Sequence, residues 1–243
     1  MVELPTVGPI PAAADSRQPT RGSFARRLLR RPVGAFSVAY LVAISLACLG
    51  APLLTPYDPL KQTLSDALAG PSATYLLGAD PLGRDVLSRL LYGGRISLLG
   101  VLQAVVVLAV VGISFGLIAG YFGRRTDGAI SAVVDIVLAI PTIIVLLAVL
   151  ATFPGMSAAM ITFGLLFSAR MARVVRGVTL AVRNELYVEA AQISGVGQLS
   201  IVLRHVLPRV AGPAIVQMSL FAGVALAVQT GIASATPANS DIW

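Results

Sequence analysis

The sequence predicts an all-α, polytopic integral membrane protein. Of its 243 residues, 56% are hydrophobic and only 12% are charged, a balance outside the usual range of soluble domains. The apolar residues form long runs, and connections rich in Gly, Pro and Arg separate these runs. Several runs reach the length of about 20 residues that a helix needs to cross a bilayer. We therefore expect about five membrane-spanning helices.

The positions of the arginines predict how the chain is oriented. The 18 Lys and Arg against 11 Asp and Glu give a net charge of +7. Basic residues precede the first apolar run and flank the later ones, as cytoplasmic connections do, so we expect no nucleic-acid partner. Those before the first run are Arg17, Arg21, Arg26, Arg27, Arg30 and Arg31. A cytoplasmic N-terminus and a plasma-membrane location follow. The only cysteine, Cys48, cannot form a disulfide within the chain.

The order of polar and apolar stretches predicts three regions. Residues 1–32 lack apolar periodicity and predict a flexible cytoplasmic tail, residues 33–232 predict the transmembrane domain, and residues 233–243 a second tail. The expected spans are 33–54, 96–122, 128–153, 157–175 and 211–232. Pro141 should bend the third span at or before Ile140, because proline has no backbone N–H. The fifth span would leave the C-terminus outside.

Two polar or small-residue features lie within the spans. Gly112, Gly116 and Gly120 share one helix face and predict close approach of a neighbouring helix. Asp135 is a carboxylate in an otherwise apolar span, where functional residues are common. Two interpretations of Asp135 stay open: an ion pair with an arginine of the cytoplasmic connections, or a role in the pore or in coupling.

The polar connection 55–95 is expected on the outer face. Within it, the apolar positions of Asp85 to Leu91 predict an amphipathic helix lying at the membrane surface, and a solvated connector is the alternative. The connection 176–209 is expected in the cytoplasm. It predicts two short helices, Glu185 to Ser194 and Gln198 to Leu207, separated by glycines that tolerate the positive φ of a helix end.

No residue pattern supports catalysis. The chain has no phosphate-cradling GxxxxGK[ST] loop, and its only histidine, His205, has no accompanying Cys, His or carboxylate cluster for a metal site or a triad. We interpret His205 as a capping or partner-contacting residue near a helix end.

Two motifs resemble those of a known family. Glu189-Ala190-Ala191, Gly195 after three further residues, and Leu207-Pro208 are similar in spacing to the EAA loop of ABC importer permeases. Leu77 to Ser97 resembles the LGTDxLGRDxxSRxxYGxRxS pattern of C-type dipeptide and oligopeptide permeases, with Ala79 in place of Thr. The segment from Asp135 to Pro141 is also similar to this family.

The resemblance implies a type I ABC importer transmembrane domain with a cytoplasmic coupling helix. It implies a non-enzymatic subunit that forms half of a pathway for peptides, with ATP and Mg on partner chains and no cofactor or metal in this one. The implied partners are a second permease subunit in a heterodimer, two ATP-binding subunits, an extracellular solute-binding protein and the lipid membrane. Similar permeases carry nickel or other solutes, and no residue here discriminates between them.

The resemblance also implies roles for individual residues. The coupling contact with the ATPases is expected at Glu189, Ala190, Ala191, Gly195, His205, Leu207 and Pro208. A gate or binding-protein contact on the outer surface is expected at Asp80, Gly83, Arg84 and Asp85. The family's sixth span has no counterpart after residue 232, so a truncated, non-transporting subunit or scaffold is one alternative. A secondary transporter that uses Asp135 is the other.

Overall fold

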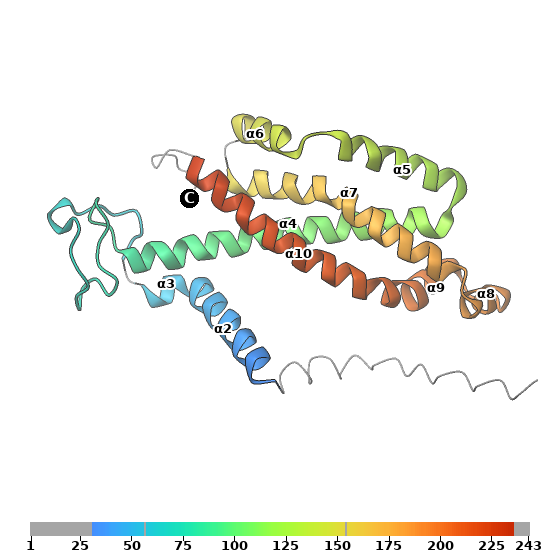
Figure 1. The fold of residues 1–243 in the computed structure, drawn as a ribbon, viewed down its shortest axis with the longest axis horizontal. Coiled ribbons are helices and arrows are strands. Elements are labelled where there is room, and N and C mark those ends of the chain that lie inside the picture. The colour runs from blue at the N-terminus through green and yellow to red at the C-terminus, as the bar shows by residue number, and fades with distance from the viewer. Residues whose placement is uncertain (1–30, 56, 154, 236–243) are drawn as a thin grey trace, which may run out of the picture. The chain divides into compact units, whose positions relative to one another are not determined.

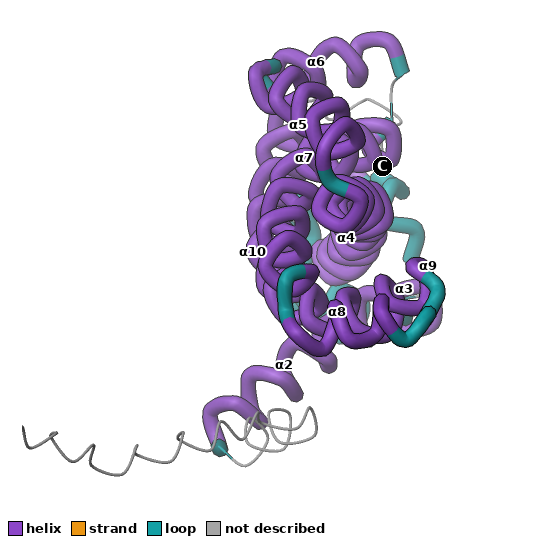
Figure 2. The backbone as a smooth tube through the Cα atoms, turned by 90° about the vertical axis from the view of Figure 1, so that its right-hand side faces the viewer, coloured by secondary structure: helices purple, strands orange, loops and turns teal. Residues whose placement is uncertain are grey.

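A computed structural model describes residues 31–55, 57–153 and 155–235 of the chain. These residues form helices and loops, with no strand beyond one isolated bridge between Ala79 and Asp85 (Figure 2). The predicted all-α fold is confirmed. The predicted tails, 1–32 and 233–243, fall almost wholly on residues outside the described ranges.

The chain divides into two units, residues 1–47 and 48–243. The first unit contributes most of α2 (Pro32–Leu49), an 18-residue helix whose apolar side chains are largely exposed, as lipid contact requires. The predicted first span, 33–54, is interrupted at Gly50, and the short helix α3 (Ala51–Leu54) follows.

The second unit is built on two parallel helices, α4 (Val86–Phe122) and α7 (Met156–Arg183), which lie side by side (Figures 1 and 2). The predicted glycine face forms their contact. A Cβ added at Gly112, Gly116 or Gly120 would come within 2.5–2.6 Å of the nearest side-chain atoms of α7. Those atoms belong to Met171, Val175 and Thr179. Glycine is therefore required for the helix backbones to approach this closely.

Helix α10 (Leu207–Ala235) packs against both α4 and α7. Its Phe221 stacks on Phe163 of α7, with ring centroids 5.2 Å apart, and also contacts Phe167 at 5.1 Å. These rings belong to one buried core that continues through Met160 and Leu108. The core is therefore shared by three long helices.

Helices α5 (Arg124–Ala139) and α6 (Thr142–Thr152) correspond to the predicted third span. The two axes differ by 78°, and the break lies at Ile140 and Pro141, so the predicted proline bend is confirmed. Within the described residues, four helices are long and apolar enough to cross a membrane, or five if this bent pair counts as one.

Two predicted boundaries were wrong. Asp85 to Leu91 is not a separate surface helix, because the 37 residues of α4 run without a break from Val86 to Phe122. The fifth span does not begin at Ala211: helix α10 starts at Leu207, directly after the π-helical turn, and continues through Pro208. Helix α9 (Gln198–Ile201) and a π-helical turn (Val202–Val206) lead directly into it.

Candidate functional site

The connection between α7 and α10 begins with α8 (Leu186–Ile193), close to the predicted first helix. Gly195 ends this helix with φ of +76°. The Gly195 N–H donates to the Gln192 carbonyl at 3.1 Å, and the Val196 N–H donates to the Ala191 carbonyl at 3.2 Å. This pair of bonds is the Schellman motif, in which a left-handed residue after the helix satisfies the last carbonyls.

The residues of the EAA motif occupy different sides of α8. Val188 is fully buried against the bundle and Ala191 is half-buried, whereas Glu189 and Ala190 are exposed. Leu186 and Ile193 are 82% and 88% exposed, and with Ala190 they recur at the spacing of a single helix face. An exposed apolar face beside a carboxylate is a surface suited to a protein partner.

Helix α8 projects from one end of the long helices, and the connection 57–85 lies at the other end (Figure 1). A cavity of about 410 Å³ separates the glycine turn from the ends of α4 and α7. Tyr121, Arg183 and Gly195 are among its lining residues. The turn is therefore not packed tightly against the bundle.

The junction between this connection and α10 contains the remaining predicted residues. His205 lies in the π-helical turn, and Leu207 and Pro208 begin α10. The His205 ring centroid is 6.3 Å from that of Tyr187, and neither His205 Nδ1 nor Tyr187 Oη has a hydrogen-bond partner within the described ranges. A wider π turn is frequent at functional positions in helices.

Asp135 forms an ion pair, as one of its two open interpretations predicts. Arg173 Nη2 of α7 donates to Asp135 Oδ1 of α5 at 2.6 Å. Their side chains are 58% and 66% exposed, and both line a cavity of about 230 Å³. Asp127 lies on α5 eight residues before Asp135, and Arg176 of α7 donates to both of its carboxylate oxygens. These two pairs join α5 to α7.

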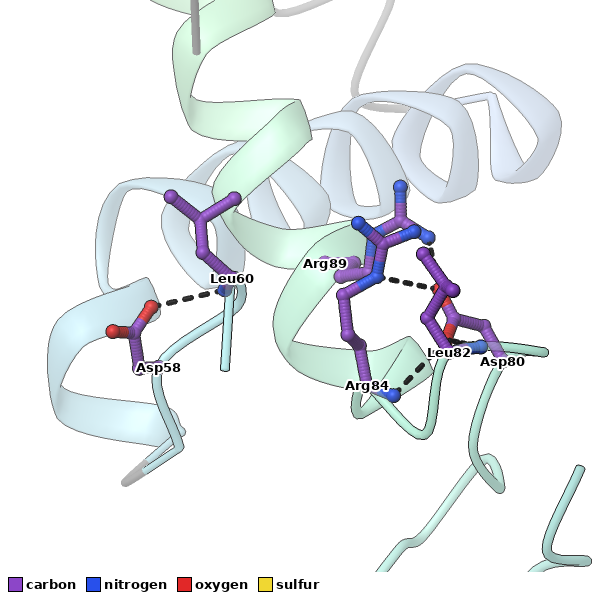
Figure 3. Close-up of polar contacts among 6 residues, drawn as sticks. All are labelled: Asp58, Leu60, Asp80, Leu82, Arg84 and Arg89. Atoms are coloured by element: carbon purple, nitrogen blue, oxygen red, sulfur yellow. Dashed lines mark hydrogen bonds and ion pairs between the residues drawn. The ribbon is translucent and has the colours of Figure 1, made fainter. Parts of the chain in front are cut away.

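Asp80 organises the connection 57–85 (Figure 3). Its Oδ1 accepts from the backbone N–H groups of Leu82 at 2.8 Å and Arg84 at 3.0 Å. Its Oδ2 accepts from Arg84 Nε at 2.8 Å and Arg89 Nη1 at 2.5 Å. Burial raises the pKa of Asp80, but the hydrogen bonds from Arg84 and Leu82 outweigh this effect and lower the pKa to about 2.

The neighbouring predicted residues are also engaged within this connection. Asp85 caps α4, since its Oδ2 accepts from the Ser88 N–H at 2.9 Å and from the Ser88 hydroxyl at 2.5 Å. Gly83 has φ of +71°, and a Cβ there would lie 1.9 Å from the Thr63 carbonyl oxygen. Arg84 and Asp85 are buried. These residues shape the connection 57–85, and both its expected position on the outer face and their contact with a gate or a binding protein stay predictions.

The structure thus places the predicted residues in three separate groups: the α8 connection, the Asp135 pair and the Asp80 turn. Sequence reasoning did not identify the Asp127–Arg176 pair, nor the position of Arg170, which stacks on Phe167 in the middle of α7. The three-residue spacing of Arg170, Arg173 and Arg176 is the signal that predicts one charged helix edge.

Comparison with known proteins adds independent support for a family. Residues 112–229 match the family described as binding-protein-dependent transport system inner membrane component. Residues 21–71 match the N-terminal TM domain of oligopeptide transport permease C.

Individual relatives extend the match over most of the chain. The dipeptide transport system permease protein DppC of Alkalihalophilus pseudofirmus is 34% identical over 209 residues, which cover 86% of this chain and 68% of that protein. The glutathione transport system permease protein GsiD of Pectobacterium atrosepticum is 34% identical over 86% of this chain and 70% of that protein. The di/tripeptide transport system permease protein DppC of Pseudomonas aeruginosa is 36% identical over 74% of this chain and 62% of that protein.

The chain therefore spans roughly two thirds of the length of these permeases, and the helices that it contains are apolar enough to make it a multi-pass inner-membrane protein. The chain belongs to the binding-protein-dependent permease family of ABC importers, in the branch of the C-type dipeptide and oligopeptide permeases.

Proposed function

We propose that this chain is the permease subunit of an ATP-driven peptide importer and forms half of the pathway with a second permease chain. An extracellular binding protein delivers the peptide, and two ATPase subunits supply the energy from the cytoplasmic side. The N-terminus lies in the cytoplasm. Peptide is the expected solute because relatives from two organisms are named dipeptide or di/tripeptide permeases.

The exposed apolar face of α8 is the observation that carries the proposal. Leu186, Ala190 and Ile193 face away from the bundle, and Glu189 beside them offers a charge partner to a basic groove. The Schellman turn at Gly195 fixes the end of α8, and the π turn links the connection to α10 without an intervening loop. Displacement of α8 by a docked ATPase is therefore transmitted to α10, which packs on α4 and α7.

The left-handed turn provides the test. Valine at position 195 must adopt φ near +76°, where a β-branched side chain clashes with the backbone, so Gly195→Val should disturb the end of α8. Gly197→Val is the matched control, because Gly197 has an ordinary φ of −59° and open space around it. We expect Gly195→Val to weaken co-purification with the ATPase subunits at least tenfold. Equal recovery of the ATPases with both variants contradicts docking at α8.

A secondary transporter that uses Asp135 as its carrier is the competing function. The ion pair with Arg173 opposes it, because one oxygen of the Asp135 carboxylate is already engaged by the Arg173 guanidinium at 2.6 Å. Import that requires ATP hydrolysis by the reconstituted complex, and that a proton ionophore leaves unchanged, supports the importer. Import by the permease chain alone, driven by a proton gradient, contradicts it.

A further inference from the structure

The middle arginines of α7 differ in how their charges are balanced. Arg176 pairs with Asp127 and Arg173 pairs with Asp135. Arg170 is exposed, and within the described residues no carboxylate lies in ion-pair distance of it. Its guanidinium carbon instead lies over the ring of Phe167, 4.5 Å from the ring centre. Arg170 therefore carries an uncompensated positive charge.

The contact between α4 and α7 places this charge at depth. Met171, next to Arg170, packs against Gly112 of α4. Ten residues, or about 15 Å of helix, separate Gly112 from the end of α4 at Phe122. Because the hydrocarbon core is about 30 Å thick and α4 has no charge from Ile96 to Phe122, Arg170 lies at a level within the hydrocarbon core.

The direction of the charge follows from the helix period. Gly164, Ser168 and Val175 are buried on the side of α7 that packs on α4. Arg170 and Arg173 lie on the exposed part of the helix. An arginine facing lipid at this depth is costly, so this side of α7 faces water or protein in the assembled importer. On the function proposed above, that environment is the translocation pathway.

The surroundings of Arg170 suit an anion. Phe167 lies under the guanidinium and is itself packed against Phe163 and Phe221, whose rings stack on each other, so the aromatic surface is held from a second helix. The contact with the Phe167 ring does not occupy the guanidinium N–H groups with a carboxylate, and their fork matches the two oxygens of such a group. A peptide carries such a group at its C-terminus.

We infer that Arg170 binds the terminal carboxylate of the peptide as the solute crosses the hydrocarbon core of the membrane. Arg170 is thus a specificity-determining residue for solutes with a free carboxylate. This inference rests on the proposed peptide-import function. The neighbouring Arg173 does not take this role, since Asp135 already neutralises it.

The experiment compares one labelled peptide as its free acid and as its C-terminal amide. The complete importer, with the second permease and the ATPases, is reconstituted in vesicles, and each peptide is supplied at a concentration that saturates the binding protein. Uptake is measured for the wild type, Arg170→Gln and Arg170→Lys. Arg125→Gln is the control, because Arg125 is exposed at the cytoplasmic end of α5. The ratio of acid to amide uptake, compared between variants, cancels the preference of the binding protein itself.

We expect Arg170→Gln to lower the acid-to-amide ratio about tenfold, the effect of losing one charge-assisted hydrogen-bonded pair. Arg170→Lys should lower the acid-to-amide ratio by a smaller factor, and Arg125→Gln should leave it unchanged. An unchanged ratio in Arg170→Gln overturns the inference while import continues. Loss of the second permease from Arg170→Gln assigns Arg170 to the subunit interface and also overturns it. A wild-type complex that imports neither form contradicts the proposed function, and the role of Arg170 fails with it.

Discussion

Asp80 is the residue on which the outer connection depends. Its carboxylate accepts four hydrogen bonds, two of them from backbone N–H groups, whereas the exposed Asp58 accepts one from the Leu60 N–H (Figure 3). We predict that Asp80→Ala removes the acceptor of the Leu82 and Arg84 amides and speeds their hydrogen exchange, at a local cost of roughly 2 kcal/mol. Asp58→Ala should leave both amides protected. Equal exchange rates of these amides in the two variants would contradict the organising role of Asp80.

Acid should reproduce this effect in the wild-type protein. The pKa of Asp80 is lowered from 3.8 to about 2, so its carboxylate stabilises the folded connection. A lowered pKa means that the contribution is complete above about pH 4 and is lost as the pH falls through the folded value near 2. Protection of the Leu82 and Arg84 amides should therefore be constant from pH 5 to pH 8, and a loss within that range contradicts the assignment.

At the scale of elements, the contact of α4 with α7 determines how the bundle packs. A Cβ at Gly116 would lie 2.6 Å from Val175 Cβ and 2.7 Å from the Ala172 carbonyl oxygen. We predict that Gly116→Ala lowers stability by about 1–3 kcal/mol, because the two backbones must separate. Thermal unfolding of the purified protein measures the change.

Gly93 provides the comparison on the same helix. Nothing lies within 4 Å of a Cβ added there, so Gly93→Ala should be neutral or slightly stabilising, as alanine favours helix more than glycine does. If both variants unfold at the same temperature as the wild type, the glycine face does not set the helix separation.

Local chemistry explains which elements could be predicted from the sequence. Pro141 breaks a helix because it lacks a backbone N–H, and Gly195 ends one because it tolerates positive φ. Both helix ends can therefore be predicted without knowledge of the tertiary structure. The fifth span was predicted to begin at Ala211, whereas α10 starts at Leu207 and continues through Pro208, because the sequence alone does not show whether a helix continues past a proline. The two glycines at 93 and 94 concealed the continuity of α4.

Contacts between distant residues were not predictable in the same way. Arg173 follows Asp135 by 38 residues, and Arg176 follows Asp127 by 49, so only the folded bundle selects these partners. The aromatic surface under Arg170 likewise needs Phe221 from another helix. Asp80 and Arg84 carried a motif that suggested an external contact, but their burial and mutual hydrogen bonds emerge only from the folded turn.

At the scale of the whole molecule, the Asp135–Arg173 pair separates two transport mechanisms. If the pair only balances charge, Asp135→Asn leaves Arg173 unpaired within a membrane span and should impair import. The double variant Asp135→Asn with Arg173→Gln should restore import, because neither charge remains. Uptake by the reconstituted complex measures both. Failure of the double variant to recover, with normal assembly, would favour Asp135 as an ion carrier.

The length of α4 has a consequence for where the importer meets its surroundings. Its 37 residues extend about 55 Å, and the charge-free part begins only at Ile96. The first ten residues, about 15 Å of helix, therefore stand above the hydrocarbon and carry the Asp80 turn clear of the lipid head groups. The start of α4 thus lies in the aqueous phase. A soluble protein can therefore reach the turn without touching the membrane, and in a thicker bilayer a shorter part of α4 stands above the hydrocarbon.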